Sequence, residues 1–123
     1  AIEELKDLDI AYSRTLAGDN NKFLLPDDWY AWMPTCHHNN PRLMELCEKF
    51  LALDDSKVYY PNRKPKLFYL WGHSYEFPQR NNWEVIEKFG QMMAERDDVW
   101  HATNMEIYKI ILENCSLFCY NVA

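Results

Sequence analysis

One histidine follows what the sequence predicts to be a buried strand in the middle of the chain. The apolar run at residues 67–71 is short, follows Pro65 and ends at Gly72, which favours a strand over a helix. His73 comes directly after that glycine. In α/β proteins functional groups gather where parallel strands end, and an imidazole can donate or accept a proton near neutral pH. His73 is therefore a candidate acid–base residue, although a structural histidine bonded to a nearby carbonyl fits the same pattern.

Two more histidines, His37 and His38, follow Cys36 on a segment that Pro34 favours as extended. Adjacent side chains on an extended segment point to opposite faces, so we expect these two not to share one metal ion. One would face a site, and the other would face solvent or cap the next helix. We predict no metal ligands in this chain.

Cysteine spacing gives no sign of a structural zinc site, because such sites usually show two tight ligand pairs. None of the cysteines forms a C-x-x-C pair, and we expect reduced thiols and a cytoplasmic setting. The four are Cys36, Cys47, Cys115 and Cys119.

The predicted elements alternate between strand and helix, as in a parallel α/β sheet or barrel. Asn40-Pro41 gives the start of one helix, as a cap residue followed by proline, and Asn104 caps another. We predict strands at residues 10–15, 67–71, 99–103 and 116–122, with helices at 1–8, 41–53, 83–96 and from 104 onward.

Two further polar groups allow both a structural and a functional interpretation. Arg14 lies near the end of the first predicted strand, where it is either a surface residue or a group that orients a carboxylate or substrate. Asp27 and Asp28 precede Trp29; such carboxylates could accept sugar hydroxyls. We favour their role at a helix N-terminus.

Composition limits the classes of function. With 123 residues, 48% of them hydrophobic, the chain fits one globular domain. A formal net charge of -6 argues against nucleic acid as a partner. No apolar run approaches the roughly 20 residues of a membrane span.

The segment LFYLWGHSYEF resembles the last motif of the polysaccharide deacetylases, the NodB-homology carbohydrate esterases. Other segments resemble the same family in the same order along nearly the whole chain. They are Tyr12-Ser13-Arg14-Thr15, Leu25-Pro26-Asp27-Asp28, Trp32-Met33-Pro34-Thr35-Cys36-His37-His38 and Trp100-His101-Ala102-Thr103-Asn104.

The resemblance implies a (β/α) barrel that hydrolyses the acetamido C–N bond of a carbohydrate with the help of a divalent metal, zinc being expected. It implies His73 as the general acid, while Arg14, His37 or His38, Trp71 and Tyr75 would shape the substrate pocket. The family's metal-binding Asp-Asp-Gly and His-x-x-x-His motifs are absent from this sequence. We therefore expect the chain to correspond to the C-terminal half of such an enzyme and to be inactive alone. A non-catalytic carbohydrate- or protein-binding module is the alternative, and metal-dependent ester hydrolysis is a third.

Half of a closed barrel would leave two strand edges unpaired. The predicted strand at residues 67–71 has no polar alternation, which is typical of strands buried on both faces. We expect self-association, or the missing half of the barrel, to cover these edges.

Overall fold

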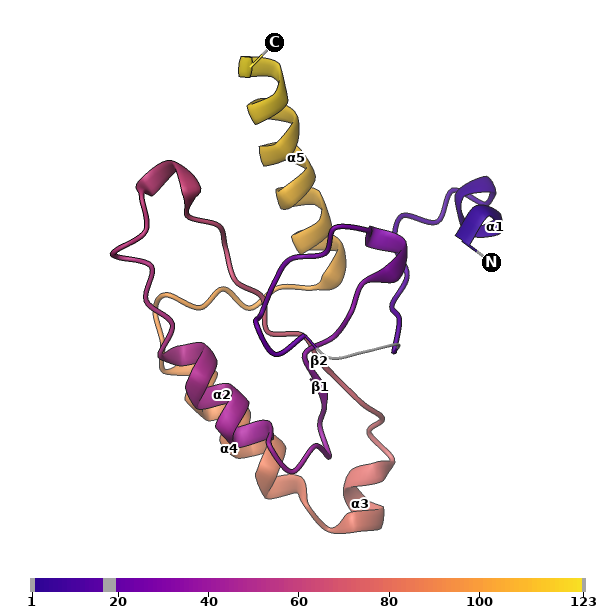
Figure 1. The fold of residues 1–123 in the computed structure, drawn as a ribbon. Coiled ribbons are helices and arrows are strands. Elements are labelled where there is room, and N and C mark those ends of the chain that lie inside the picture. The colour runs from indigo at the N-terminus through magenta and orange to yellow at the C-terminus, as the bar shows by residue number, and fades with distance from the viewer. Residues whose placement is uncertain (1, 17–19, 123) are drawn as a thin grey trace. The chain divides into compact units, whose positions relative to one another are not determined.

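The computed structural model describes residues 2–16 and 20–122, with side chains described as far as residue 113. The chain divides into two compact units, Ala1–Gln91 and Met92–Ala123, and every predicted site residue lies in the first. The elements in chain order are α1 (Ile2–Asp7), the 3-10 helix η1 (Trp29–Ala31), β1 (Cys36–His37), α2 (Leu43–Leu51), the 3-10 helix η2 (Tyr60–Asn62), β2 (Leu70–Trp71), α3 (Glu76–Arg80), α4 (Trp83–Ala94) and α5 (Asn104–Val122). Figure 1 labels the helices α1–α5 and the strands β1 and β2 along the chain.

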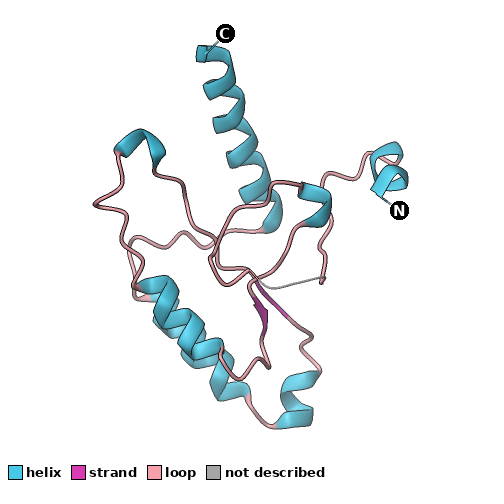
Figure 2. Ribbon diagram, in the orientation of Figure 1, coloured by secondary structure: helices cyan, strands magenta, loops and turns pink. Residues whose placement is uncertain are grey.

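A parallel pair of short strands, β1 and β2, forms the sheet (Figure 2). The register places Cys36 opposite Leu70 and His37 opposite Trp71. Backbone bonds extend the pairing by one residue at each end, from the Thr35 amide to the Tyr69 carbonyl and from the His38 amide to the Trp71 carbonyl, both 2.8 Å. The predicted parallel association is thus present at these strands, and the barrel stays a prediction.

The core of the first unit lies beside this pair. The amphipathic helix α2 buries Leu43, Leu46 and Cys47, while its charged residues stay outside. Partly buried side chains from β2 and α4 pack against the same cluster. The buried cluster is Phe23, Cys36, Leu43 and Leu46, and the residues packed on it are Met44, Phe50, Phe68, Leu70, Val85 and Phe89.

The helices α1, α2 and α4 lie within the predicted ranges, with ends that differ by one or two residues, a usual variation. The Asn40 side chain accepts the Arg42 amide at 2.8 Å, in the turn that leads into α2. Asp28 accepts the Tyr30 amide at 2.9 Å and caps η1, so the capping interpretation of this aspartate is confirmed.

Helix α3 was not predicted. Its proline, Pro78, lies in the first turn, where a missing N–H leaves no helical bond unmade. The helix ends at Asn81, which adopts a left-handed conformation with φ of 50°. This short helix matters because it begins with Glu76, a residue of the candidate site.

Several strand predictions are wrong. Residues 99–103 form a loop in which Thr103 accepts the Glu106 amide at the start of α5. Residues 116–122 continue α5, since no proline or glycine interrupts the chain after residue 104. The strand predicted at 10–15 is reduced to one parallel bridge between Arg14 and Trp32.

The strand predicted at 67–71 is also shorter than expected, because only Leu70–Trp71 belongs to β2. It is not buried on both faces: Leu67 is buried, but residues 68–71 are partly exposed. Among the described helices, none is long and apolar enough to cross a membrane.

Candidate functional site

The two strands run in the same direction, so the residues after both of them meet at one edge of the pair. His38 follows β1, and Gly72 and His73 follow β2. A cavity of about 340 Å³, wide open to solvent, lies there. Residues that line it include Arg14, His38, Trp71, His73, Ser74 and Phe77.

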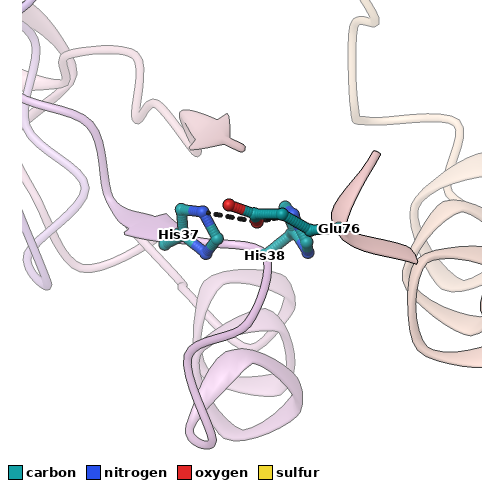
Figure 3. Close-up of side chains that lie close together, drawn as sticks. All are labelled: His37, His38 and Glu76. Carbon is teal, nitrogen blue, oxygen red and sulfur yellow. Dashed lines mark ion pairs between the residues drawn. The ribbon is translucent and has the colours of Figure 1, made fainter. Parts of the chain in front are cut away.

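At this edge His37 and His38 both approach the carboxylate of Glu76 (Figure 3). The Nε2 atom of His37 lies 3.0 Å from Glu76 Oε2, and that of His38 lies 2.7 Å from the same oxygen. The two imidazole rings stack with their centroids 4.3 Å apart. The expectation that these histidines point to opposite faces is therefore wrong.

The physical reason is a turn directly after β1. His37 is the last strand residue, and the Asn40 amide bonds back to its carbonyl at 3.0 Å. His38 therefore belongs to a turn, where the alternation of an extended chain no longer applies. Both rings are also held by aromatic neighbours: Trp71 meets His37 edge-on at 4.4 Å, and Phe77 stacks on His38 at 4.2 Å.

Gly72 is required by the position of the His38 ring. A Cβ atom on Gly72 would lie 1.7 Å from His38 Cδ2, far inside any allowed contact. Gly72 thus leaves space for the His38 ring. The sequence alone does not reveal this contact.

A side-chain network orients the Glu76 carboxylate. Asn39 donates from Nδ2 to Glu76 Oε2 at 3.1 Å, and Asn82 donates from Nδ2 to Asn39 Oδ1 at 2.9 Å. The network ties the turn after β1 to the start of α3 and to the residue before α4. None of these three residues was predicted as part of a site, although Glu76 stands in the polar run that follows the central strand.

The two imidazoles differ in their hydrogen bonding. His37 Nδ1 accepts the Asn39 backbone amide at 3.0 Å. Burial lowers the pKa of His37 despite the opposing effect of Glu76, so the neutral ring is favoured. The His38 side chain is only 3% exposed, and neither of its nitrogens makes a hydrogen bond to a described residue. Its 2.7 Å approach to Glu76 is close but not aligned as a hydrogen bond.

The other predicted site residues lie around the same edge. His73 is exposed and stacks on Tyr75 at 5.3 Å, with its centroid 6.1 Å from that of Trp71. The Arg14 guanidinium lies over the Trp71 ring, 4.3 Å from its centroid. The structure thus brings Arg14, His38, Trp71 and His73 together around one cavity, while Tyr75 reaches it through its contact with His73.

Comparison of the chain with protein-family models, with curated proteins and with solved structures finds no match to any of them.

Proposed function

We propose that the chain forms the acid-donating and substrate-holding part of a carbohydrate N-deacetylase site, which hydrolyses an acetamido C–N bond. The observation that carries this proposal is the cavity at the ends of the parallel pair, where Arg14, Trp71 and His73 are among the lining residues. The resemblance of the segments that bear these residues to deacetylase motifs supports it.

His73 is the proposed general acid. Amide hydrolysis expels a poor leaving group, and protonation of its nitrogen makes the C–N bond easier to break. Histidine suits this role because its charge changes near neutral pH. The exposed ring of His73 lines the cavity and stacks on the Tyr75 ring.

Trp71 and Tyr75 contribute differently to substrate binding. One face of Trp71 is covered by Arg14, so we assign Trp71 to positioning that guanidinium. The Tyr75 side chain is 58% exposed and offers an aromatic surface and a hydroxyl beside His73. Arg14, with its hydrogen-bond donors, would bind a carbonyl or hydroxyl oxygen of the sugar.

The resemblance also implies a divalent metal, which in such enzymes polarises the acetyl carbonyl and activates water. The residues named above do not depend on that ion for their own roles.

Sugar binding tests the proposal first. We expect an N-acetylglucosamine oligomer to bind more tightly than the same oligomer of glucosamine, as measured by titration calorimetry. Tyr75→Ala and Arg14→Met should each weaken binding about tenfold, the effect of losing roughly 1.4 kcal/mol. Tyr59→Ala, which changes another exposed aromatic residue of the first unit that does not line the cavity, should bind normally. Equal affinity for both sugars, or none for either, would contradict the proposal.

Release of acetate tests the acid. Where turnover is measured, His73→Ala should lower kcat by roughly 10²–10⁴, while His101→Ala, at an exposed histidine, should not. Preferential binding without any acetate release, with or without added zinc, would instead identify a non-catalytic carbohydrate-binding module.

A further inference from the structure

We propose that His37, His38 and Glu76 bind one divalent transition-metal ion, with zinc as the best fit. Their candidate ligand atoms all lie within 4.8 Å of one another. This inference is independent of the proposed function, because it concerns metal affinity and needs neither sugar nor turnover. It reverses the sequence-based expectation of no metal ligands, which relied on the two histidines facing apart.

The donor set is the first argument. Two imidazoles and one carboxylate form a ligand set found in catalytic zinc sites, where three protein ligands leave one position open. In a tetrahedral site with metal–ligand bonds near 2.1 Å, ligand atoms lie roughly 3.4 Å apart. The two nitrogen–oxygen separations here, 3.0 and 2.7 Å, are slightly shorter. A small rotation of the Glu76 side chain away from the rings would therefore open the space for an ion.

The state of His38 is the second and independent argument. Its side chain is 97% buried, given the 3% exposure, and neither ring nitrogen has a hydrogen-bond partner among the described residues. Buried polar atoms are normally satisfied, yet His38 Nδ1 has no partner among the described residues, and Nε2 meets only the Glu76 carboxylate, without the alignment of a hydrogen bond. A cation between His38 Nε2 and the carboxylate would satisfy both groups at once.

The surroundings hold the three ligands in place. Asn39 donates to the Glu76 carboxylate, and Asn82 fixes the Asn39 amide in turn. Such outer contacts orient metal ligands and affect affinity by about 10–100-fold. Phe77 and Gly72 set the His38 ring, the first by stacking and the second by leaving room.

One contact must change when the ion binds. Coordination through His37 Nε2 puts the ring proton on Nδ1, where it would face the Asn39 backbone amide that now donates to that atom. Losing this hydrogen bond would reduce affinity about fivefold, a small penalty beside the affinity of three ligands. It also gives a specific signature, a shift of the Asn39 amide resonance on metal loading.

Zinc titration of the full chain against a chromophoric chelator tests the proposal. We expect one equivalent to bind, and Glu76→Gln and His37→Gln each to weaken affinity at least about tenfold. His73→Ala, which removes a histidine at the same edge, should bind as the wild type does. The double variant Cys115→Ser and Cys119→Ser should also bind normally, which separates this site from adventitious thiol binding.

Circular dichroism without metal shows whether each variant is folded. If Glu76→Gln is not folded, His37→Gln, which changes a more exposed ligand, still tests the proposal. Wild-type thermal stability should rise with zinc, and that of His37→Gln should rise less. Substoichiometric binding, unchanged affinity in His37→Gln, or loss of binding in the cysteine variant would overturn the proposal.

Discussion

The ends of the two strands stand side by side but are built differently. At the end of β1, the side chains of His37 and His38 are at least three-quarters buried and are enclosed by Glu76, Trp71 and Phe77. After β2, His73 is exposed and has one close stacking partner, Tyr75. An enclosed imidazole is fixed in position, as a metal ligand must be, whereas an exposed one can meet a substrate and exchange protons. Histidine thus suits two roles at this edge of the strand pair, metal binding at the end of β1 and proton transfer after β2.

Two residues create this difference. Gly72 leaves room for the His38 ring, and Glu76 at the first turn of α3 places a carboxylate over both rings. Both belong to the β2 side of the edge, yet both act on histidines from the β1 side. Substitutions at the ends of the two strands should therefore change the stability of the protein by unequal amounts.

The largest effect is expected for Gly72→Ala. The added Cβ would overlap His38, so the ring must leave its place, at about 1–3 kcal/mol of stability. Urea denaturation followed by circular dichroism measures this loss.

Gly90→Ala is the matched control for that substitution. Nothing lies within 4 Å of a Cβ at this helical position, and replacing a mid-helix glycine by alanine should stabilise by about 0.5–1 kcal/mol. If Gly72→Ala were as stable as the wild type or more so, as expected for Gly90→Ala, Gly72 would not be reserving space for His38.

A smaller effect is expected from pH. Burial lowers the pKa of His37, so the folded protein takes up a proton here less readily than the unfolded chain, whose imidazole has a pKa of 6.5. The free energy of unfolding should therefore fall as pH drops below 6.5 and level off below the folded-state pKa. Between about pH 7.5 and 5.5, wild type should lose more stability than His37→Gln. An equal loss in both proteins would show that His37 does not contribute to the pH dependence.

The smallest effect is expected at Arg14. Its guanidinium over Trp71 is exposed, and such cation–π contacts contribute about 0.5–1 kcal/mol. Arg14→Met should reduce the unfolding free energy by that amount, and Arg14→Lys by less. A loss above about 2 kcal/mol would mean that Arg14 has a larger structural role than this contact provides.

Local sequence patterns predicted much of the helical structure. The apolar spacing of α2 and α4 and the capping by Asp28 were enough, because these features depend on residues close together in the chain. The predicted strand–helix alternation is not seen as such: two of the four predicted strands are absent from the described residues, and the other two are reduced to a two-residue strand and a single bridge. An apolar run such as residues 67–71 indicates that a strand is present, whereas its hydrogen-bonded length depends on partners that the run itself does not encode.

The candidate site was predicted in part. His73, Arg14 and Trp71 were identified, and the structure places them around one cavity. The prediction missed that the His37 and His38 rings lie side by side, because the strand ends at His37 and His38 already belongs to a turn. Glu76 was missed as well, since its approach to two residues nearly 40 positions earlier depends on how α3 meets β1.

The difference between the two strand ends can be measured directly by following the ring nitrogens of all four histidines by NMR during a zinc titration. We expect the His37 and His38 resonances to shift together and to saturate at one equivalent, while those of His73 and His101 stay unchanged. A shift of His73 alone, equal shifts of all four rings, or no saturation would contradict this expectation.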